Sequence, residues 1–481
     1  MSQLFISLDK NKQKLDTMFR NSADYYFKYI KIFNITCAVV MCDDLTDSSK
    51  LGEIFLNPLN NLKGEKDPIE VFDYIKNDTT IPFNRDTAKT FEKAFAYITS
   101  GMALLFIDGV NQAFVMSVQG YPSRSIGEST SEGNLRASKE SFTEVLRKNM
   151  ALVRKKIRSE NLTIKTMQIG NKSKTEVSVF YHADYCPEQI VIDVTERLKD
   201  IDLPMVFEPG YITPFIDRTK NSIFSSVGYT ERPDTFCAKL CEGKIGILID
   251  GTPYAIIYPF FFHENFVTND DYTQRPYFAS FIRFLRYFAF IIAIALPGFY
   301  VAFSSYAPQS LSDDLIFFIY SSQYSTPLPL FVEAIVITII LEIIKEAGLR
   351  LPAPIGSSVS IVSALIIGDA VINAGLIGSA ILIICAFSTI AAFIIPSFYE
   401  PIIIMRIIFI LLSGFWGIPG LAFATFILFV NIVCVKTEEM NYTYMLNPFN
   451  KSFLKDVIFR SSWRKAKDDF NLKEKYNESQ K

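Results

Sequence analysis

The stretch RYFAFIIAIALPGFYVAFSSY, residues 286–306, decides the fold class of this 481-residue chain. As a helix, this apolar run is long enough to cross about 30 Å of hydrocarbon. Its surroundings agree, because residues 281–435 contain twelve charged side chains, whereas the whole chain has 48 Lys and Arg and 50 Asp and Glu. A soluble domain of that length needs a more charged surface, and a bundle that faces lipid does not tolerate one. The chain is therefore predicted to be an integral membrane protein.

About six spans are predicted in residues 281–435, and four spans with re-entrant segments are the alternative. The segments expected to follow residues 286–306 are 328–344, 355–371, 376–395 and a hairpin of two short spans in 401–435. The hairpin is expected because glycine and proline interrupt the last apolar run, at Gly414, Gly417, Pro419 and Gly420. An even number of spans leaves both ends of the chain on one side of the membrane.

Charges next to the spans predict which side that is. Arg283 and Arg286 precede the first span, which places the N-terminal region in the cytoplasm and holds it against the inner leaflet. The loop 307–327 has Asp313 and Asp314 but no basic residue, as an outer loop should. The tail mixes basic and acidic residues and is expected inside.

The predicted fold class is an α/β soluble N-terminal region of two lobes, followed by an all-α polytopic transmembrane bundle. Two similar segments carry the prediction of two lobes: GMALLFIDG at 101–109 and GKIGILIDG at 243–251. Each predicts a strand, an Asp-Gly turn and a second strand. Related lobes are one interpretation, and unrelated hairpins with a common turn are the other. The predicted domains are cytosolic lobes at 1–168 and 169–280, a transmembrane domain at 281–435 and a charged cytosolic tail at 436–481.

One helix of the soluble region is predicted from its two ends. Ser141 to Glu144 fits a capping box that opens it, and the basic run Arg154 to Arg158 closes it. Cations at a helix C-terminus need no partner, because the macrodipole favours them. The alternative is a basic patch that faces anionic lipid or an acidic subunit.

Several functional classes are not expected. A formal net charge of −2 argues against a nucleic-acid partner. His182 and His263 have no nucleophile motif beside them, and the sequence has no phosphate-binding loop or metal-ligand spacing. We therefore expect neither an enzyme nor a cofactor, and we expect the seven cysteines to be reduced thiols.

Ordered motifs across residues 30–435 resemble one known family. They include the run GYPSRSI at 120–126 with Glu128 and Arg136, DGTP at 250–253, EIIKEAGLRLP at 342–352 and IVSALIIGDAV at 361–371. These motifs resemble the GerA family A subunits of bacterial spore germinant receptors. Ser129, Ala137, Lys345 and Asp369 depart from the family pattern, and Asp369 places an ionisable group where the family usually has glutamine.

The resemblance implies a subunit of a nutrient receptor in the inner membrane of a bacterial endospore, with its N-terminal region and tail on the spore-core side. It would work with a transporter-like B subunit and a lipoprotein C subunit, and form a homo-oligomer that conducts cations or gates their passage. A paralogue associated with dipicolinate release is the first alternative. A secondary transporter is the second, although residues 286–435 show no internal symmetry.

Candidate functional residues follow from charge and from the resemblance. The acids predicted to line an ion pathway are Glu333, Glu342 and Asp369, and an interfacial ion network is predicted for Lys345, Glu346 and Arg350 together with Glu342. For Glu333 and Asp369 the alternative is a protonated carboxyl bonded to a neighbouring helix. The loop residues predicted to make a gating or subunit contact are Tyr121, Pro122, Arg124, Ser125 and Arg136. The alternative for Arg124 is a bond to carbonyls of its own lobe.

Overall fold

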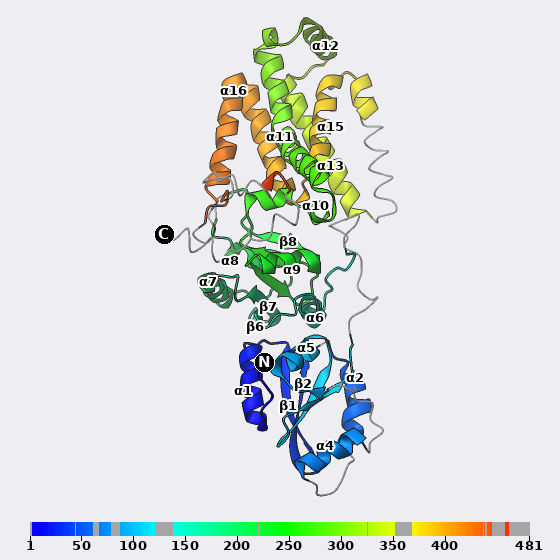
Figure 1. Cartoon of the computed structure of the whole chain (residues 1–481). Helices are drawn as coiled ribbons and strands as arrows, with labels where there is room; N and C mark the ends of the chain where they lie inside the picture. Colours follow the sequence, from blue (N-terminus) through cyan, green and yellow to red (C-terminus); the bar gives the residue numbers. More distant parts are fainter. Residues whose placement is uncertain are drawn as a thin grey trace.

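Two lobes of mixed helix and sheet precede a bundle of helices in the computed structural model (Figure 1). This arrangement confirms the predicted fold class. The residues described are 2–43, 45–60, 67–77, 87–120, 138–219, 222–324, 326–351, 368–435, 437, 440–444 and 457–460.

The first lobe is a five-stranded antiparallel sheet in the order β1-β2-β4-β5-β3, with helices on both faces. Side chains of α1 and α5 form the core on one face, and those of η1 and α4 form it on the other. The strand β4 supplies residues to both cores, and all five of its residues are buried. The elements are α1 Leu8–Met18, β1 Tyr25–Ile32, β2 Ile35–Cys42, α2 Ser48–Lys50, η1 Leu51–Leu56, α3 Asn57–Asn60, α4 Pro68–Asn77, β3 Thr87–Ala88, α5 Phe91–Thr99, β4 Ala103–Ile107 and β5 Ala113–Met116.

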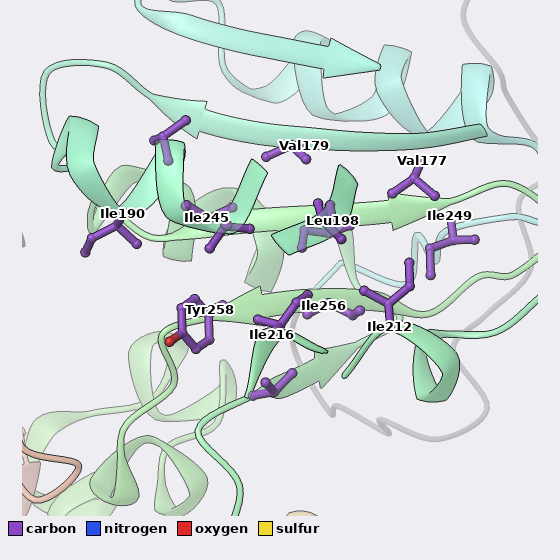
Figure 2. Close-up of a cluster of buried hydrophobic side chains, with 14 of the residues drawn as sticks. Val177, Val179, Ile190, Leu198, Ile212, Ile216, Ile245, Ile249, Ile256 and Tyr258 are labelled. Carbon is purple, nitrogen blue, oxygen red and sulfur yellow. The ribbon is translucent and has the colours of Figure 1, made fainter. Parts of the chain in front are cut away.

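The second lobe repeats this plan, with the strand order β6-β7-β9-β10-β8. Aliphatic side chains of α7 and α8 pack on one face of its sheet (Figure 2), and α6 and α9 cover the other. The elements are α6 Leu146–Lys156, β6 Leu162–Ile169, β7 Thr175–His182, α7 Glu188–Lys199, α8 Pro209–Ile216, β8 Gly228–Thr230, α9 Pro233–Cys241, β9 Ile245–Ile249 and β10 Ala255–Tyr258.

The division between the lobes lies earlier in the chain than predicted. A boundary at residue 168 falls inside β6, which pairs along its whole length with β7. Helix α6 also belongs to the second lobe, because Leu146, Met150 and Val153 pack in its core. The boundary between the two lobes in the sequence therefore lies between β5 and α6.

A repeated set of hydrogen bonds shows that the lobes are related. The Asp108 carboxylate of the first Asp-Gly turn accepts from the N–H of Leu8, the first residue of α1, at 3.2 Å. The Asp250 carboxylate of the second turn accepts from the N–H of Leu146, the first residue of α6, at 3.0 Å. Each turn thus caps the helix that opens its own lobe. The predicted capping box at Ser141–Glu144 is wrong, because the cap comes from a hairpin about a hundred residues away in sequence.

An asparagine in the first turn of each of these helices repeats the pattern. Asn11 accepts from the Phe5 N–H at 2.8 Å and donates to the Phe5 carbonyl at 2.7 Å. Asn149 does the same with the N–H and carbonyl of Thr143, at 2.8 and 2.6 Å. Two unrelated hairpins would not share these bonds, so the interpretation as related lobes is the correct one.

A buried ion pair joins the two lobes. Arg154 of α6 donates to both carboxylate oxygens of Asp24, which precedes β1, at 2.6 and 3.0 Å. Both side chains are almost fully buried. Burial alone would raise the pKa of the Asp24 carboxyl, but the Arg154 charge and its hydrogen bonds hold that pKa below its usual value. The basic run at the end of α6 is therefore not simply a surface patch, because its first residue, Arg154, binds Asp24 of the first lobe.

We predict that Asp24→Ala destabilises the lobes by about 3–5 kcal/mol, since it leaves the Arg154 guanidinium buried without its counter-charge. Because the folded pKa of Asp24 is lowered, its stabilising contribution is present above about pH 4 and is lost as the pH falls through the folded value. Thermal unfolding of the full chain between pH 3 and 7 measures both effects.

The control is Asp43→Ala. Asp43 pairs with Arg147 across the same interface, but both side chains are about one-third exposed. That change should cost no more than about 1 kcal/mol. Equal effects of the two substitutions would contradict a structural role for the buried pair.

The C-terminal half is helical. Among the described residues, two helices are long and apolar enough to cross a membrane, Pro276–Tyr306 and Pro396–Val433. The predicted span 328–344 corresponds to α13, and the predicted span 376–395 corresponds to the shorter apolar helix α15. Most of the predicted span 355–371 lies outside the described residues, so the total of six spans stays a prediction. The elements are η2 Phe262–Phe266, α10 Asp270–Thr273, α11 Pro276–Tyr306, η3 Pro308–Ser310, α12 Asp313–Gln323, α13 Leu330–Arg350, α15 Ser379–Phe393, η4 Pro396–Phe398 and α16 Tyr399–Val433.

Helix α16 folds back on itself at Gly417. Phe398, just before it, packs on Phe224 of the second lobe, and Asn431 near its other end bonds Ser222 and Ile223. A straight helix of 35 residues would separate its ends by about 52 Å. Gly417 has non-helical dihedrals, φ 62° and ψ −134°, and Figure 1 shows the two arms. The structure thus has the hairpin that was predicted in residues 401–435.

We predict that Gly417→Ala destabilises this hairpin by about 1–3 kcal/mol. Its positive φ disfavours any side chain, and an added Cβ would lie 2.6 Å from the Tyr306 ring. Gly210→Ala is the matched control, because nothing lies within 4 Å of a Cβ there. Thermal unfolding followed by tryptophan fluorescence, which reports on neighbouring Trp416, measures the difference. A Gly417→Ala chain as stable as the control would contradict a fixed reversal at this residue.

Candidate functional site

Glu333 is the most deeply buried acid of the helical bundle. It lies in the first turn of α13 and has no exposed surface. One carboxylate oxygen accepts from the N–H of Gly378, the N-cap residue of α15, at 2.9 Å. An anion is favoured there by the positive end of the helix dipole. The other oxygen, Oε1, has no hydrogen-bond partner.

Glu342 lies in a different environment. It accepts from the Tyr399 hydroxyl at 2.6 Å and is partly exposed. It follows Glu333 by nine residues, about two and a half helical turns, so the two acids project from opposite sides of α13. The structure therefore does not bring Glu333 and Glu342 together on one helix face.

The predicted interfacial ion network is only partly present. Arg350 and Glu346 pair at 2.6 Å, as their spacing predicts, but both are exposed, and such a pair contributes little stability. Lys345 instead lies over the rings of Phe393 and Tyr399. Tyr399 thus contacts Lys345 through its ring and holds Glu342 by a hydrogen bond.

Asp369 is exposed on the helical residues 368–373. Of the three acids predicted to line an ion pathway, Glu333 is therefore buried, Glu342 is half-buried and Asp369 is exposed. The residues predicted to make a gating contact, Tyr121, Pro122, Arg124, Ser125 and Arg136, lie outside the described residues.

A groove runs between α13 and the first arm of α16, with a volume of about 470 Å³. Glu342 and Glu346 lie along it, and its walls are otherwise mostly aliphatic. The residues that line it are Thr338, Ile339, Glu342, Ile343, Glu346, Ala347, Arg350, Ile403 and Ile407.

Arg406 is a functional candidate that the sequence argument did not select. It lies on the first arm of α16 and is 2% exposed. Its guanidinium donates to the carbonyls of Ala293 and Ser388 and to the Thr389 hydroxyl, at 2.7, 3.1 and 3.0 Å. It thereby joins three helices through neutral acceptors. The sequence did contain a signal for this residue, because a single arginine within an apolar run is unusual.

The two arginines before the first span bind an acid rather than lipid. Asp271 of α10 accepts from Arg283 at 2.9 Å and from Arg286 at 2.8 and 3.0 Å. Arg286 also donates to the Phe266 carbonyl. Asp271 and Arg283 have almost no exposed surface. The expectation that these arginines hold the soluble region against the inner leaflet is wrong, because their charges are used to fix α11 to the segment that precedes it.

A second buried charge cluster lies on the other side of that segment. Glu264 of η2 binds Lys239 of α9 at 2.7 Å and also binds Lys244, both in the second lobe. Burial alone would raise the pKa of the Glu264 carboxyl, but the two ammonium groups hold it well below its usual range. Burial lowers the pKa of the Lys244 ammonium to about 8, although Glu264 opposes this shift. Glu264 is thus an ionised clamp on the second lobe.

Aromatic side chains complete this junction between lobe and bundle. Phe262 packs against Phe290 of α11 and Phe398 of η4, and Phe266 stacks on Tyr287 of α11. The tail contributes too, because Tyr442 is buried against Phe262 and its carbonyl accepts from the Phe262 N–H. The region 436–481 is therefore not only a charged extension: residues 440–444 are part of the junction.

Comparison with known proteins gives consistent matches. The family model of the Bacillus/Clostridium GerA spore germination protein matches residues 13–470. Spore germination protein KA of Bacillus subtilis is 33% identical over 95% of this chain and 85% of its own length. Spore germination protein B1 of the same organism is 31% identical over 87% of this chain and 86% of its own length.

A solved structure also matches. The N-terminal domain of the A subunit of the Bacillus megaterium spore germinant receptor GerK3 is 28% identical, with a TM-score of 0.43. The match covers 54% of this chain and 96% of that one. The family model and the relatives together span nearly all of the sequence, including both lobes and the helices. The chain therefore belongs to the Bacillus/Clostridium GerA spore germination protein family.

Proposed function

We propose that the chain is the A subunit of a germinant receptor, which acts in nutrient-triggered germination as an oligomeric, ligand-gated cation channel or as its gating component. In this role it is not an enzyme. Its helical half crosses the inner membrane of the endospore, and its lobes lie on the spore-core side. Its partners are a transporter-like B subunit, a lipoprotein C subunit and further copies of itself. The observation that carries the channel proposal is Glu333, a carboxylate buried among apolar helices.

The names of the relatives support the germination role. The proteins KA and B1 of Bacillus subtilis are named as spore germination proteins and match across most of both chains. The second candidate is the paralogue class associated with dipicolinate release. Not every relative is named for germination, since the stage V sporulation protein AF of Bacillus subtilis is also similar, at 25% identity. A gene neighbourhood with receptor B and C genes would favour the first candidate.

The junction supports a gating role. In it the short segment 262–271 binds the second lobe through Glu264 and binds α11 through Asp271. Buried, fully paired charges resist separation, since breaking such a pair costs several kcal/mol. A movement of the second lobe is therefore passed to α11 and to the ends of α16 rather than absorbed in a linker. Nutrient binding elsewhere in the receptor could in this way alter the packing around Glu333.

We predict that Glu333→Gln lowers cation flux through the reconstituted receptor by at least about tenfold, because it removes the charge from the buried site. Glu342→Gln and Asp369→Asn are tested beside it, and exposed Glu346→Gln is the control expected to leave flux unchanged. Flux is measured as cation efflux from vesicles after addition of the nutrient mixture. Unchanged flux in all three test variants would remove these acids from the mechanism.

We also predict that Glu264→Gln uncouples the lobe from the helices. The substitution leaves Lys239 and Lys244 buried with less counter-charge, which should destabilise the junction by about 3–5 kcal/mol. Spores that carry it should assemble the receptor but need more nutrient for half-maximal germination. Glu242→Gln is the matched control, because Glu242 binds the same Lys239 but is more exposed. A normal nutrient response in Glu264→Gln spores with normal receptor levels would rule out this coupling.

A further inference from the structure

One surface helix of the second lobe has an outer side without charge. Helix α8 contains no charged side chain along its whole length. Its residues Ile212 and Ile216 point into the core of the sheet (Figure 2). Tyr211 and Phe215, one helical turn apart on its other side, are exposed. The neighbouring helix α7 carries charged residues on its exposed side, as a helix that faces water normally does.

Two more aromatic side chains extend this exposed surface. The Phe207 ring lies edge-on to the Tyr211 ring, with centroids 6.4 Å apart. The hydroxyl of Tyr229, on the edge strand β8, shares a hydrogen bond with the hydroxyl of Thr213 on α8, at 2.6 Å. The residues that we call the aromatic face are Phe207, Tyr211, Phe215 and Tyr229, and each is between 40% and 52% exposed. A contiguous exposed apolar surface of this kind usually marks a contact with another molecule.

The chain ties the aromatic face to both ends of α16. The segment between α8 and β8 makes the two contacts. Ser222 donates to the carbonyl of Asn431, near the end of α16, at 3.3 Å, and Phe224 packs on Phe398, just before its start. Figure 1 agrees, because it shows α8 between α7 and the helices of the bundle. The aromatic face therefore lies where the two arms of α16 reach the second lobe.

The face also continues onto the bundle itself. The loss of water around the Tyr229 hydroxyl raises its pKa, and the nearby charge of Glu400, in the first turn of α16, raises it further. Tyr399, the residue before Glu400, stacks on Phe393 with centroids 6.1 Å apart. Phe393 ends α15 and is exposed. Exposed aromatic side chains thus lie on the second lobe and on the end of the bundle that is next to it.

The chemistry of the face fits lipid. Tyrosine is enriched at the headgroup level of membranes, where its ring meets acyl chains and its hydroxyl meets water. A surface beside the point at which a spanning helix leaves the bilayer lies at this level. Neutral aromatic side chains are suited to that boundary, and their burial there stabilises the contact in proportion to the apolar area that leaves water.

We propose that the aromatic face inserts into the headgroup region of the bilayer beside α16. The second lobe is thereby held against the membrane surface by apolar contacts, while Arg283 and Arg286 are used within the protein. The inference rests on the proposed function in one respect, namely that the helical half crosses a membrane. The lipid contact itself goes beyond that function, and it requires no channel.

Fluorescence quenching by brominated lipid tests this contact in the full chain. The background carries Trp416→Phe and Trp463→Phe, and Phe215→Trp adds one reporter to the aromatic face. The chain is reconstituted into phosphatidylcholine vesicles, because the face has no charge that requires an anionic lipid. With bromine on the acyl chains close to the headgroup, the Phe215→Trp reporter should lose about half of its fluorescence, since an interfacial side chain lies next to the acyl chains.

Three further reporters make the result specific. Tyr211→Trp in the same background should be quenched to a similar extent, and it replaces Phe215→Trp if that variant does not fold. Ile192→Trp is the matched control, because Ile192 is similarly exposed on α7 of the same lobe and should keep its fluorescence. A chain that keeps Trp416 as its only tryptophan reports on α16 and should be quenched.

The possible outcomes separate this contact from the proposed function. A Phe215→Trp reporter quenched no more than Ile192→Trp, in vesicles where Trp416 is quenched, would overturn the lipid contact alone. A reporter that ignores brominated lipid but emits at shorter wavelength once other receptor subunits are added would assign the face to a protein instead. If Trp416 is not quenched either, the helices are not in the bilayer, and the proposed function falls together with this inference. Quenched reporters without nutrient-triggered flux would keep the lipid contact and overturn only the channel.

Discussion

The carboxylate of Asp271 is the constraint on which the arrangement of the two halves depends. It receives Arg283 and Arg286 from the start of α11 and is itself almost completely buried. An unpaired charge on a helix that enters lipid is costly. Both arginines pair with Asp271 where α11 begins. The direction in which α11 leaves the second lobe is therefore fixed by these ion pairs as well as by packing.

Packing around this anchor extends the same rigidity to the other helices. Phe262 and Phe266 pack on α11 and on Phe398, and both ends of α16 return to the second lobe. Arg406 then joins α16 to α11 and α15 deeper in the bundle. The buried Glu333 lies farther along these same helices, at the end remote from the lobes. Packed helices thus connect the junction with Glu333, which has no exposed surface.

The sequence predicts much of this fold because its strongest signals are local. Apolar runs separate the two halves, the Asp-Gly turns predict both hairpins, and glycine and proline predict the reversal of α16. The aspartates of those turns also cap α1 and α6, which could not be predicted because the contacts join residues about a hundred positions apart. The boundary at residue 168 was misplaced for the same reason, since α6 and β6 find their partners only in the folded second lobe.

The site was predicted less completely, because a charge in a sequence does not show its counter-charge. Arg283 and Arg286 fit the rule for cytoplasmic ends of spans, yet their partner Asp271 makes them structural. Glu333 was selected as an acid in an apolar segment, but the sequence did not show that the N-cap of α15 would be its partner. Only the packing of α13 against α15 brings the Gly378 N–H to this carboxylate.

Hydrogen–deuterium exchange of the full chain in lipid nanodiscs tests most directly whether lobe and bundle are one mechanical unit. In Asp271→Asn, the account predicts faster exchange both in α9 of the second lobe and at the ends of α16, with the first lobe unchanged. Faster exchange confined to α10 and the first turn of α11 would contradict it, because the junction would then be a local contact and not the link between the two halves.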